Sequence, residues 1–295
     1  MNNLSTIAIA QRQAFDEQGY LLVRGVLDEG DFAPLRRVIS AAIDNHAKKL
    51  YDQGKIPSLY EDLSFYHRLT RIQRESQKGS LLGWNWNKEV FSREVYGLLT
   101  HPKILDIVDS LIGPEITVNG DYWIRFKMPT GGESVFPWHQ DSIYYNGNAD
   151  PGQRVTFSEE SQILTVWIPM VDVDEHNGCL QIIPGSHKQG LRPPRRDENG
   201  RLVPIEDVES WGEVQNVRMK VGDILVFGNL TFHRSLENIS DDIRWSIDLR
   251  YSPTGSPLEW LLQKWPGFIA RSQQQPETVE SWEIWQAKRT PTEPI

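Results

Sequence analysis

The spacing of apolar residues changes once along this 295-residue chain, near Ile116. Before this point they recur every three to four positions, which is typical of amphipathic helices. After it, short runs rich in Val, Ile, Leu and aromatic residues alternate with Gly, Pro and Asn, which indicates strands joined by turns. The pattern predicts a mainly β fold of the sandwich or jelly-roll type, with helices gathered at the N-terminus.

Five helices and nine strands are expected, counting one early strand between the first two helices. The last helix has Pro102 in its first turn and Gly113 after its end, the usual asymmetry of helix termini. The helices are predicted at 5–18, 28–51, 63–77, 88–99 and 102–112, and the strands at 20–27, 116–119, 122–128, 163–173, 180–183, 214–220, 223–227, 231–236 and 243–251.

The chain is expected to form one domain over 1–295. Residues 1–113 would be a mainly helical support, 114–255 the jelly-roll core and 256–295 a C-terminal extension. The extension carries several tryptophans and could pack over the barrel or form an oligomer contact. The sequence does not decide between these, and it leaves the oligomeric state open.

Composition narrows the classes of partner. A hydrophobic content of 39% is typical of a globular chain, and a net charge of −9 argues against nucleic acid and anionic membranes. The basic segment 192–196 runs against this trend and is read as a solvated turn rather than an anion site.

No run approaches the roughly 20 apolar residues of a membrane span, and 7–10 is too short for a signal-peptide core. Cys179 is the single cysteine, which excludes an internal disulfide and favours a cytoplasmic location.

Two histidines and one aspartate form a candidate metal site. His139 and Asp141 are two residues apart, so at the end of an extended strand their side chains leave on the same side. His233 would be the third ligand, and two imidazoles with one carboxylate leave three positions open on an octahedral ion, which suits non-haem Fe(II). A structural zinc site would need a fourth protein ligand. His187 is the rival third ligand.

The predicted strand 243–251 places an arginine in the barrel. Its alternation puts Arg244, Ser246, Asp248 and Arg250 on one face and the apolar residues between them on the other. A buried arginine is costly unless it meets an anion, and its planar fork matches a carboxylate. Arg244 is therefore a candidate anion-binding residue.

At these residues the sequence resembles the phytanoyl-CoA dioxygenase family of Fe(II)/2-oxoglutarate-dependent oxygenases. The resemblance rests on the run Trp138, His139, Gln140 and Asp141 and on the segments 164–174, 177–188 and 233–244. It implies a double-stranded β-helix, cupin-like and buttressed by α-helices, with His139, Asp141 and His233 holding Fe(II). Arg244 would bind the distal carboxylate of 2-oxoglutarate, with weaker roles for Ser246, Ser235 and Trp167.

The resemblance also implies the reaction, in which O2 and 2-oxoglutarate give succinate and CO2 while a substrate is oxidised. Halogenating relatives replace the carboxylate ligand with a small residue, so Asp141 favours hydroxylation. Desaturation or ring formation by the same chemistry stays open, as do a cupin-like enzyme using another metal and a non-catalytic binding protein. Arg244 argues against the cupin-like enzyme, and the complete set of ligands argues against a protein that only binds.

The substrate is expected to be a small metabolite or natural-product intermediate rather than a coenzyme A thioester, because the chain is acidic and lacks a clear basic groove. Segment 146–161 could form a lid. The candidate substrate-binding residues are Trp138, Tyr144, Tyr145, Asn119, Trp123, Arg125 and Arg250; packing inside the barrel is an equally good reading of each.

Overall fold

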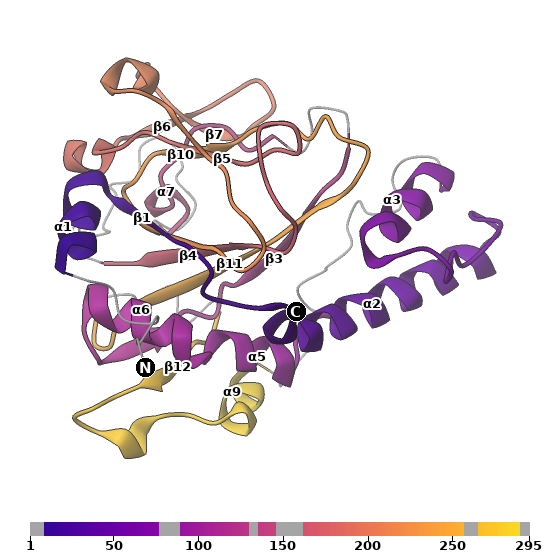
Figure 1. Cartoon of the computed structure of the whole chain (residues 1–295), viewed down its shortest axis with the longest axis horizontal. Helices are drawn as coiled ribbons and strands as arrows, with labels where there is room; N and C mark the ends of the chain where they lie inside the picture. The colour runs from indigo at the N-terminus through magenta and orange to yellow at the C-terminus, as the bar shows by residue number, and fades with distance from the viewer. Residues whose placement is uncertain (1–8, 77–88, 130–134, 146–161, 257–264, 290–295) are drawn as a thin grey trace.

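The computed structural model describes residues 9–76, 89–129, 135–145, 162–256 and 265–289, and its described strands form three antiparallel sheets (Figure 1). The major sheet has the order β1 (Tyr20–Val23), β9 (Ile224–Gly228), β4 (Leu164–Pro169), β11 (Arg244–Pro253), β2 (Ile116–Val118) and β12 (Phe268–Arg271), and β3 (Trp123–Lys127) also pairs with β11. The minor sheet is β10 (His233–Ser235), β5 (Leu180–Ile182) and β8 (Gln215–Val217), and β6 (Pro194–Arg196) pairs with β7 (Leu202–Pro204).

The helices over Glu29–Asp52, Arg93–Leu99 and Pro102–Ile112 lie on one side of the major sheet and the minor sheet lies on the other (Figure 1). The capping box of Asp28 and Asp31 starts the longest helix, and Gly113, at φ +87°, ends α6. The α-helices in the described part of the chain are α1 (Ile9–Gln18), α2 (Glu29–Asp52), α3 (Phe65–Glu75), α5 (Arg93–Leu99), α6 (Pro102–Ile112), α7 (Ser142–Tyr145) and α9 (Trp282–Arg289). The short 3-10 helices are η1 (Ser186–Gln189), η2 (Val208–Trp211) and η3 (Pro276–Thr278).

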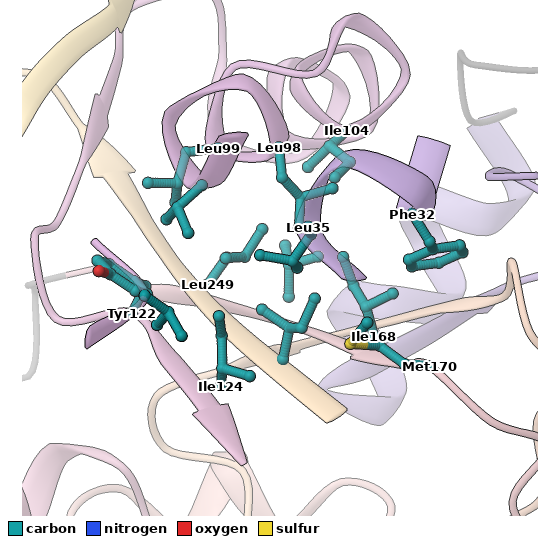
Figure 2. Packing of buried hydrophobic residues seen from close by; sticks show 14 of the residues in the cluster. Phe32, Leu35, Leu98, Leu99, Ile104, Tyr122, Ile124, Ile168, Met170 and Leu249 are labelled. Carbon is teal, nitrogen blue, oxygen red and sulfur yellow. The ribbon is translucent and has the colours of Figure 1, made fainter. Parts of the chain in front are cut away.

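The two faces of the major sheet have different chemistry. On β11 the residues Trp245, Ile247 and Leu249 join the main apolar cluster, which the helices complete. Figure 2 shows Leu249 and Ile168 of the sheet together with Phe32 and Leu35 of α2. The alternating polar residues of β11 are also buried, but on the face toward the minor sheet. The predicted alternation is confirmed, and it places charged side chains inside the barrel.

The predicted jelly roll with helical support is confirmed, although most strands are shorter than expected and β11 runs two residues further than predicted. The α6 bounds match the prediction, whereas the expected strand 20–27 ends at Val23. The basic segment 192–196 was expected to be a solvated turn, but part of it forms the exposed strand β6. The expected helix starts near 5 and 88 and the predicted lid 146–161 fall on residues outside the described part of the chain.

The C-terminal segment belongs to the same structure as the barrel. Strand β12 pairs with β2 at the edge of the major sheet, and Trp285 of α9 is fully buried. Its indole N–H donates to the Pro266 carbonyl at 2.8 Å, and its ring contacts Phe91 and Phe268. One apolar cluster therefore takes residues from the N-terminal helices, the sheet and the C-terminal segment.

Candidate active site

His139 and His233 lie opposite each other in an isolated antiparallel bridge. The His139 N–H donates to the His233 carbonyl at 3.0 Å, and the His233 N–H donates to the His139 carbonyl at 3.1 Å. Direct cross-strand partners point to the same face of a sheet, so both imidazoles enter the barrel together, with ring centroids 4.1 Å apart. Where a strand end was expected, His139 forms only this single bridge, and Asp141 begins the turn into α7.

Both imidazoles are held in the tautomer that leaves Nε2 free to bind a metal. His139 Nδ1 lies 2.8 Å from the Pro137 carbonyl and His233 Nδ1 lies 3.0 Å from the Thr231 carbonyl. A carbonyl oxygen only accepts hydrogen bonds, so each Nδ1 carries the proton and each Nε2 keeps a free lone pair. These two Nε2 atoms lie 3.6 and 3.7 Å from Asp141 Oδ1. The three side chains, all buried, can offer ligand atoms to one ion.

Electrostatics keep Asp141 and His233 in their metal-binding protonation states. Burial alone would raise the pKa of the Asp141 carboxyl, but the Arg250 guanidinium and the two imidazoles outweigh it and hold this pKa well below its usual range. Burial, and then the neighbouring His139, lower the pKa of His233 to about 3. The site therefore offers a carboxylate and a neutral imidazole at neutral pH.

Gln140 fixes the backbone between the two ligands that flank it. Its amide donates to the carbonyls of Gly190 and Leu230, each at 2.8 Å, and its carbonyl accepts from the Arg192 N–H at 2.8 Å. The side chain is fully buried and every one of these partners is backbone. The segment that carries His139 and Asp141 is therefore tied to two neighbouring loops.

The far end of the same interior holds two buried cations. Arg244 is 3% exposed, donates from Nη1 to Ser246 Oγ at 2.5 Å and lies over the Trp167 ring at 5.5 Å. Lys127 is 4% exposed and donates from Nζ to Ser235 Oγ at 2.7 Å and to a backbone carbonyl. Burial lowers the pKa of Arg244 to about 10 and that of Lys127 to about 7.

These two cations fit a dicarboxylate cosubstrate. Within the described part of the chain, no carboxylate lies within ion-pairing distance of Arg244 or Lys127, and Arg244 Nε is buried without a hydrogen-bond partner. Buried charge is stable only when it is paired, so an anion is missing from this end of the interior. The Ser235 hydroxyl accepts hydrogen bonds from Lys127 Nζ and from the Phe136 N–H.

An aromatic surface lies beside His139. The rings of Phe136 and Tyr144 have centroids 4.7 and 5.6 Å from that of His139, and both residues are 37% exposed. Arg125 packs over the rings of Trp123 and Phe136 and donates from Nε to Asp248 Oδ2 at 2.6 Å. The structure thus brings three of the predicted substrate residues, Tyr144, Trp123 and Arg125, to one side of the metal site.

Other predicted residues lie elsewhere. Trp138 points into a separate apolar cluster with Ile183 and Phe232, and its indole N–H donates to Glu209 at 2.8 Å, because neighbours along an extended segment face opposite ways. Asn119 is fully buried at the β2 end of the barrel and accepts from Ser252. His187 lies in η1 against the Asp16 carbonyl and is not part of the metal cluster. The Tyr145 side chain is outside the described part of the chain.

Arg250 was expected either to bind the substrate or to pair with Asp248. Its Nη2 lies 3.2 Å from Asp141 Oδ2 and 3.8 Å from Asp248 Oδ2.

Three residues of the site were not predicted. Lys127 shares a strand and a face with Arg125, and Phe136 precedes His139 by three residues. Thr165 is polar within an apolar strand, and its hydroxyl donates to Asp141 Oδ2 at 2.5 Å. A charged or polar residue inside an apolar strand was the available signal for Lys127 and Thr165.

A cupin-like barrel that holds two histidines, one carboxylate and two cations without a carboxylate partner among the described residues defines a metal-dependent oxygenase of the 2-oxoglutarate class. The family model described as phytanoyl-CoA dioxygenase (PhyH) matches residues 15–246. The chain belongs to this family, and it is an Fe(II)/2-oxoglutarate-dependent dioxygenase that uses O2.

Individual relatives are distant. The peroxisomal phytanoyl-CoA dioxygenase of Bos taurus is 24% identical over 255 residues, covering 84% of this chain and 69% of the relative. The 1-deoxypentalenic acid 11-beta-hydroxylase of Streptomyces arenae is 26% identical over 271 residues, covering 85% and 84%. The structure of EctD from S. alaskensis with 2-oxoglutarate and 5-hydroxyectoine matches with a TM-score of 0.56 and 19% identity over 87% of this chain and 79% of that one, which is a likeness of fold.

Proposed function

We propose that the protein hydroxylates a C–H bond of a small organic molecule, with His139, Asp141 and His233 binding the iron. Arg244 and Lys127 bind the distal carboxylate of 2-oxoglutarate. The observation that carries this proposal is that the metal-binding group and the unpaired cations lie within one barrel interior, on the face that the minor sheet covers. The retained carboxylate of Asp141 favours hydroxylation over halogenation.

Iron bound here would supply the activation of O2. The chain's own residues keep Asp141 ionised and His233 neutral, orient both imidazoles through backbone hydrogen bonds and place Arg244 to neutralise the diacid. Ser246 and Trp167 fix the Arg244 guanidinium, which then presents its remaining donors to a carboxylate. Such positioning decides where the cosubstrate lies relative to the metal.

A cavity of about 330 Å3 beside the metal site indicates the class of substrate. Its apolar lining includes Phe136, Tyr144 and Leu202, and the hairpin of β6 and β7 adds Arg196 and Arg201. Arg201 pairs with Asp197, whereas the Arg196 guanidinium contacts only a backbone carbonyl among the described residues. We therefore propose a substrate with an apolar body and one anionic group, of the size of a small metabolite.

The reaction class is tested first without a substrate. Anaerobic addition of Fe(II) and 2-oxoglutarate to metal-free protein should give a visible absorption band that neither component gives alone. Oxygen should then release succinate, and a true substrate should increase that release. Wild-type protein that gives neither the band nor succinate with any compound would contradict the proposed function.

The substrate class is tested with matched pairs of compounds. Small hydrophobic carboxylic acids should stimulate succinate release more than their neutral amides, and Arg196→Gln should reduce that preference without changing the Fe(II)/2-oxoglutarate band. Stimulation by amides equal to that by acids would contradict the anionic group. Stimulation by coenzyme A thioesters alone would contradict the assignment to a small metabolite.

We also propose that residues 1–295 act as one catalytic domain in the cytoplasm. The shared apolar cluster supports the first point, and the single cysteine Cys179, which is buried, supports a reducing compartment. Among the described helices, none is both long and apolar enough to cross a membrane. Fractionation of cells that express the full chain tests the location, and recovery in an organelle would contradict it.

A further inference from the structure

The two carboxylate oxygens of Asp141 have different surroundings. Oδ1 lies 3.6 Å from His139 Nε2 and 3.7 Å from His233 Nε2, so it faces the point where the imidazole lone pairs meet. Oδ2 accepts a hydrogen bond of 2.5 Å from Thr165 Oγ1 and lies 3.2 Å from Arg250 Nη2. One oxygen is therefore presented to a metal, while the other is engaged by two donors.

Both donors are held by the sheet itself. Thr165 of β4 and Arg250 of β11 are direct cross-strand partners in two central strands, and they are 1% and 5% exposed. Arg250 also lies 3.8 Å from Asp248, which accepts from Arg125 at 2.6 Å. The donors are thus fixed by backbone register and, for Arg250, by the buried carboxylate of Asp248.

We propose that Thr165 and Arg250 are positioning residues that restrict Asp141 to binding the iron through Oδ1 alone. This inference rests on the proposed function. A carboxylate that binds through both oxygens occupies one more coordination position. The keto acid of 2-oxoglutarate needs two positions and O2 needs one, so the three positions left by two histidines and one oxygen are all required. Holding Oδ2 away from the metal keeps the third position open.

The test compares isosteric and conservative variants in the full chain. Thr165→Val removes the hydroxyl donor with little change of volume, and Thr165→Ser keeps it. Outer-shell partners of metal ligands typically change affinity by about 10- to 100-fold. We expect Thr165→Val to weaken 2-oxoglutarate binding, measured by the anaerobic Fe(II) absorption band, by about 10-fold or more. Thr165→Ser should bind within about two-fold of wild type, and Arg250→Met should weaken binding at least as much as Thr165→Val.

Two further readouts separate positioning from a purely structural role. Co(II) titration of the metal-free protein measures metal affinity without turnover, and thermal unfolding measures stability. A structural role would lower the melting temperature of Thr165→Val but leave the dissociation constants of Co(II) and of 2-oxoglutarate within about two-fold of wild type. That result would overturn the inference. Failure of the proposed function would look different, because wild-type protein itself would then give no Fe(II)/2-oxoglutarate band.

Discussion

Lys127 and Arg244 are direct cross-strand partners in β3 and β11, so two cations that are more than nine-tenths buried lie side by side on the same face of the sheet. Such an arrangement is unfavourable in the absence of an anion, since like charges repel and neither is hydrated. It indicates that the folded protein sacrifices stability at this position to bind an anionic ligand.

Replacing Lys127 with methionine should therefore separate stability from ligand binding. We expect Lys127→Met to raise the free energy of unfolding of the ligand-free protein by about 1 to 3 kcal/mol at pH 6, because the buried charge is removed. The same variant should raise the KM for 2-oxoglutarate. Urea unfolding and succinate assays measure the two effects. A variant that is both less stable and unchanged in KM would contradict the role of this lysine.

The lowered pKa of Lys127 sets a pH dependence. The lysine is charged below its pKa of about 7 and loses its charge as the pH rises through that value. We expect the KM for 2-oxoglutarate to rise from about pH 6 to pH 8 in wild type and to change less in Lys127→Met. Between about 7 and 10.5 the unfolded chain holds a proton that the folded chain lacks, so the free energy of unfolding should rise over this range.

Arg244 should determine cosubstrate affinity without affecting the metal. Truncating one partner of a buried charge pair typically costs about 2 to 5 kcal/mol, which corresponds to about 30-fold or more in affinity. We expect Arg244→Met to raise the KM for 2-oxoglutarate by at least this factor while Co(II) affinity stays unchanged. Arg234→Met is the matched control, because Arg234 pairs with Glu209 outside the site. Equal effects of the two substitutions would argue against the assignment.

Asp141→Ala should abolish succinate release and also destabilise the fold, because it leaves the Arg250 guanidinium buried without its nearer carboxylate partner. Adding Arg250→Met to this variant should recover much of the lost stability but none of the activity. Thermal unfolding and succinate assays on the two single variants and the double variant provide the measurement. Undiminished succinate release by Asp141→Ala would exclude it as an iron ligand.

Trp285 tests whether the C-terminal segment is part of the folded unit. Replacing a fully buried tryptophan with alanine leaves a large cavity and typically costs about 3 to 5 kcal/mol. We expect this loss for Trp285→Ala in urea unfolding, whereas Ile284→Ala, at an adjacent residue that is 48% exposed, should cost less than about 1 kcal/mol. Similar stabilities of the two variants would indicate that the segment does not contribute to the core.

The sequence predicted the face of each residue on β11 better than it predicted the contacts of those residues. Alternation along one strand placed Arg244 and Arg250 inside the barrel, because a strand repeats every two residues whatever its neighbours are. The alternation could not reveal that Lys127 lies directly across from Arg244 or that Thr165 donates a hydrogen bond to Asp141, since these contacts depend on strand register. The position of Trp138 next to His139 in the sequence does not bring its side chain to the metal site, because neighbours along an extended segment point to opposite sides.

The bridge between His139 and His233 means that the metal site exists only once these two segments have paired. The two segments are far apart in the chain, and their pairing closes the minor sheet over the polar face of the major sheet. An unfolded chain therefore has no preformed pair of imidazoles, and metal can select only molecules in which the barrel has closed. We expect iron loading to act as a check on assembly, so that incompletely folded chains are spared iron-driven oxidation.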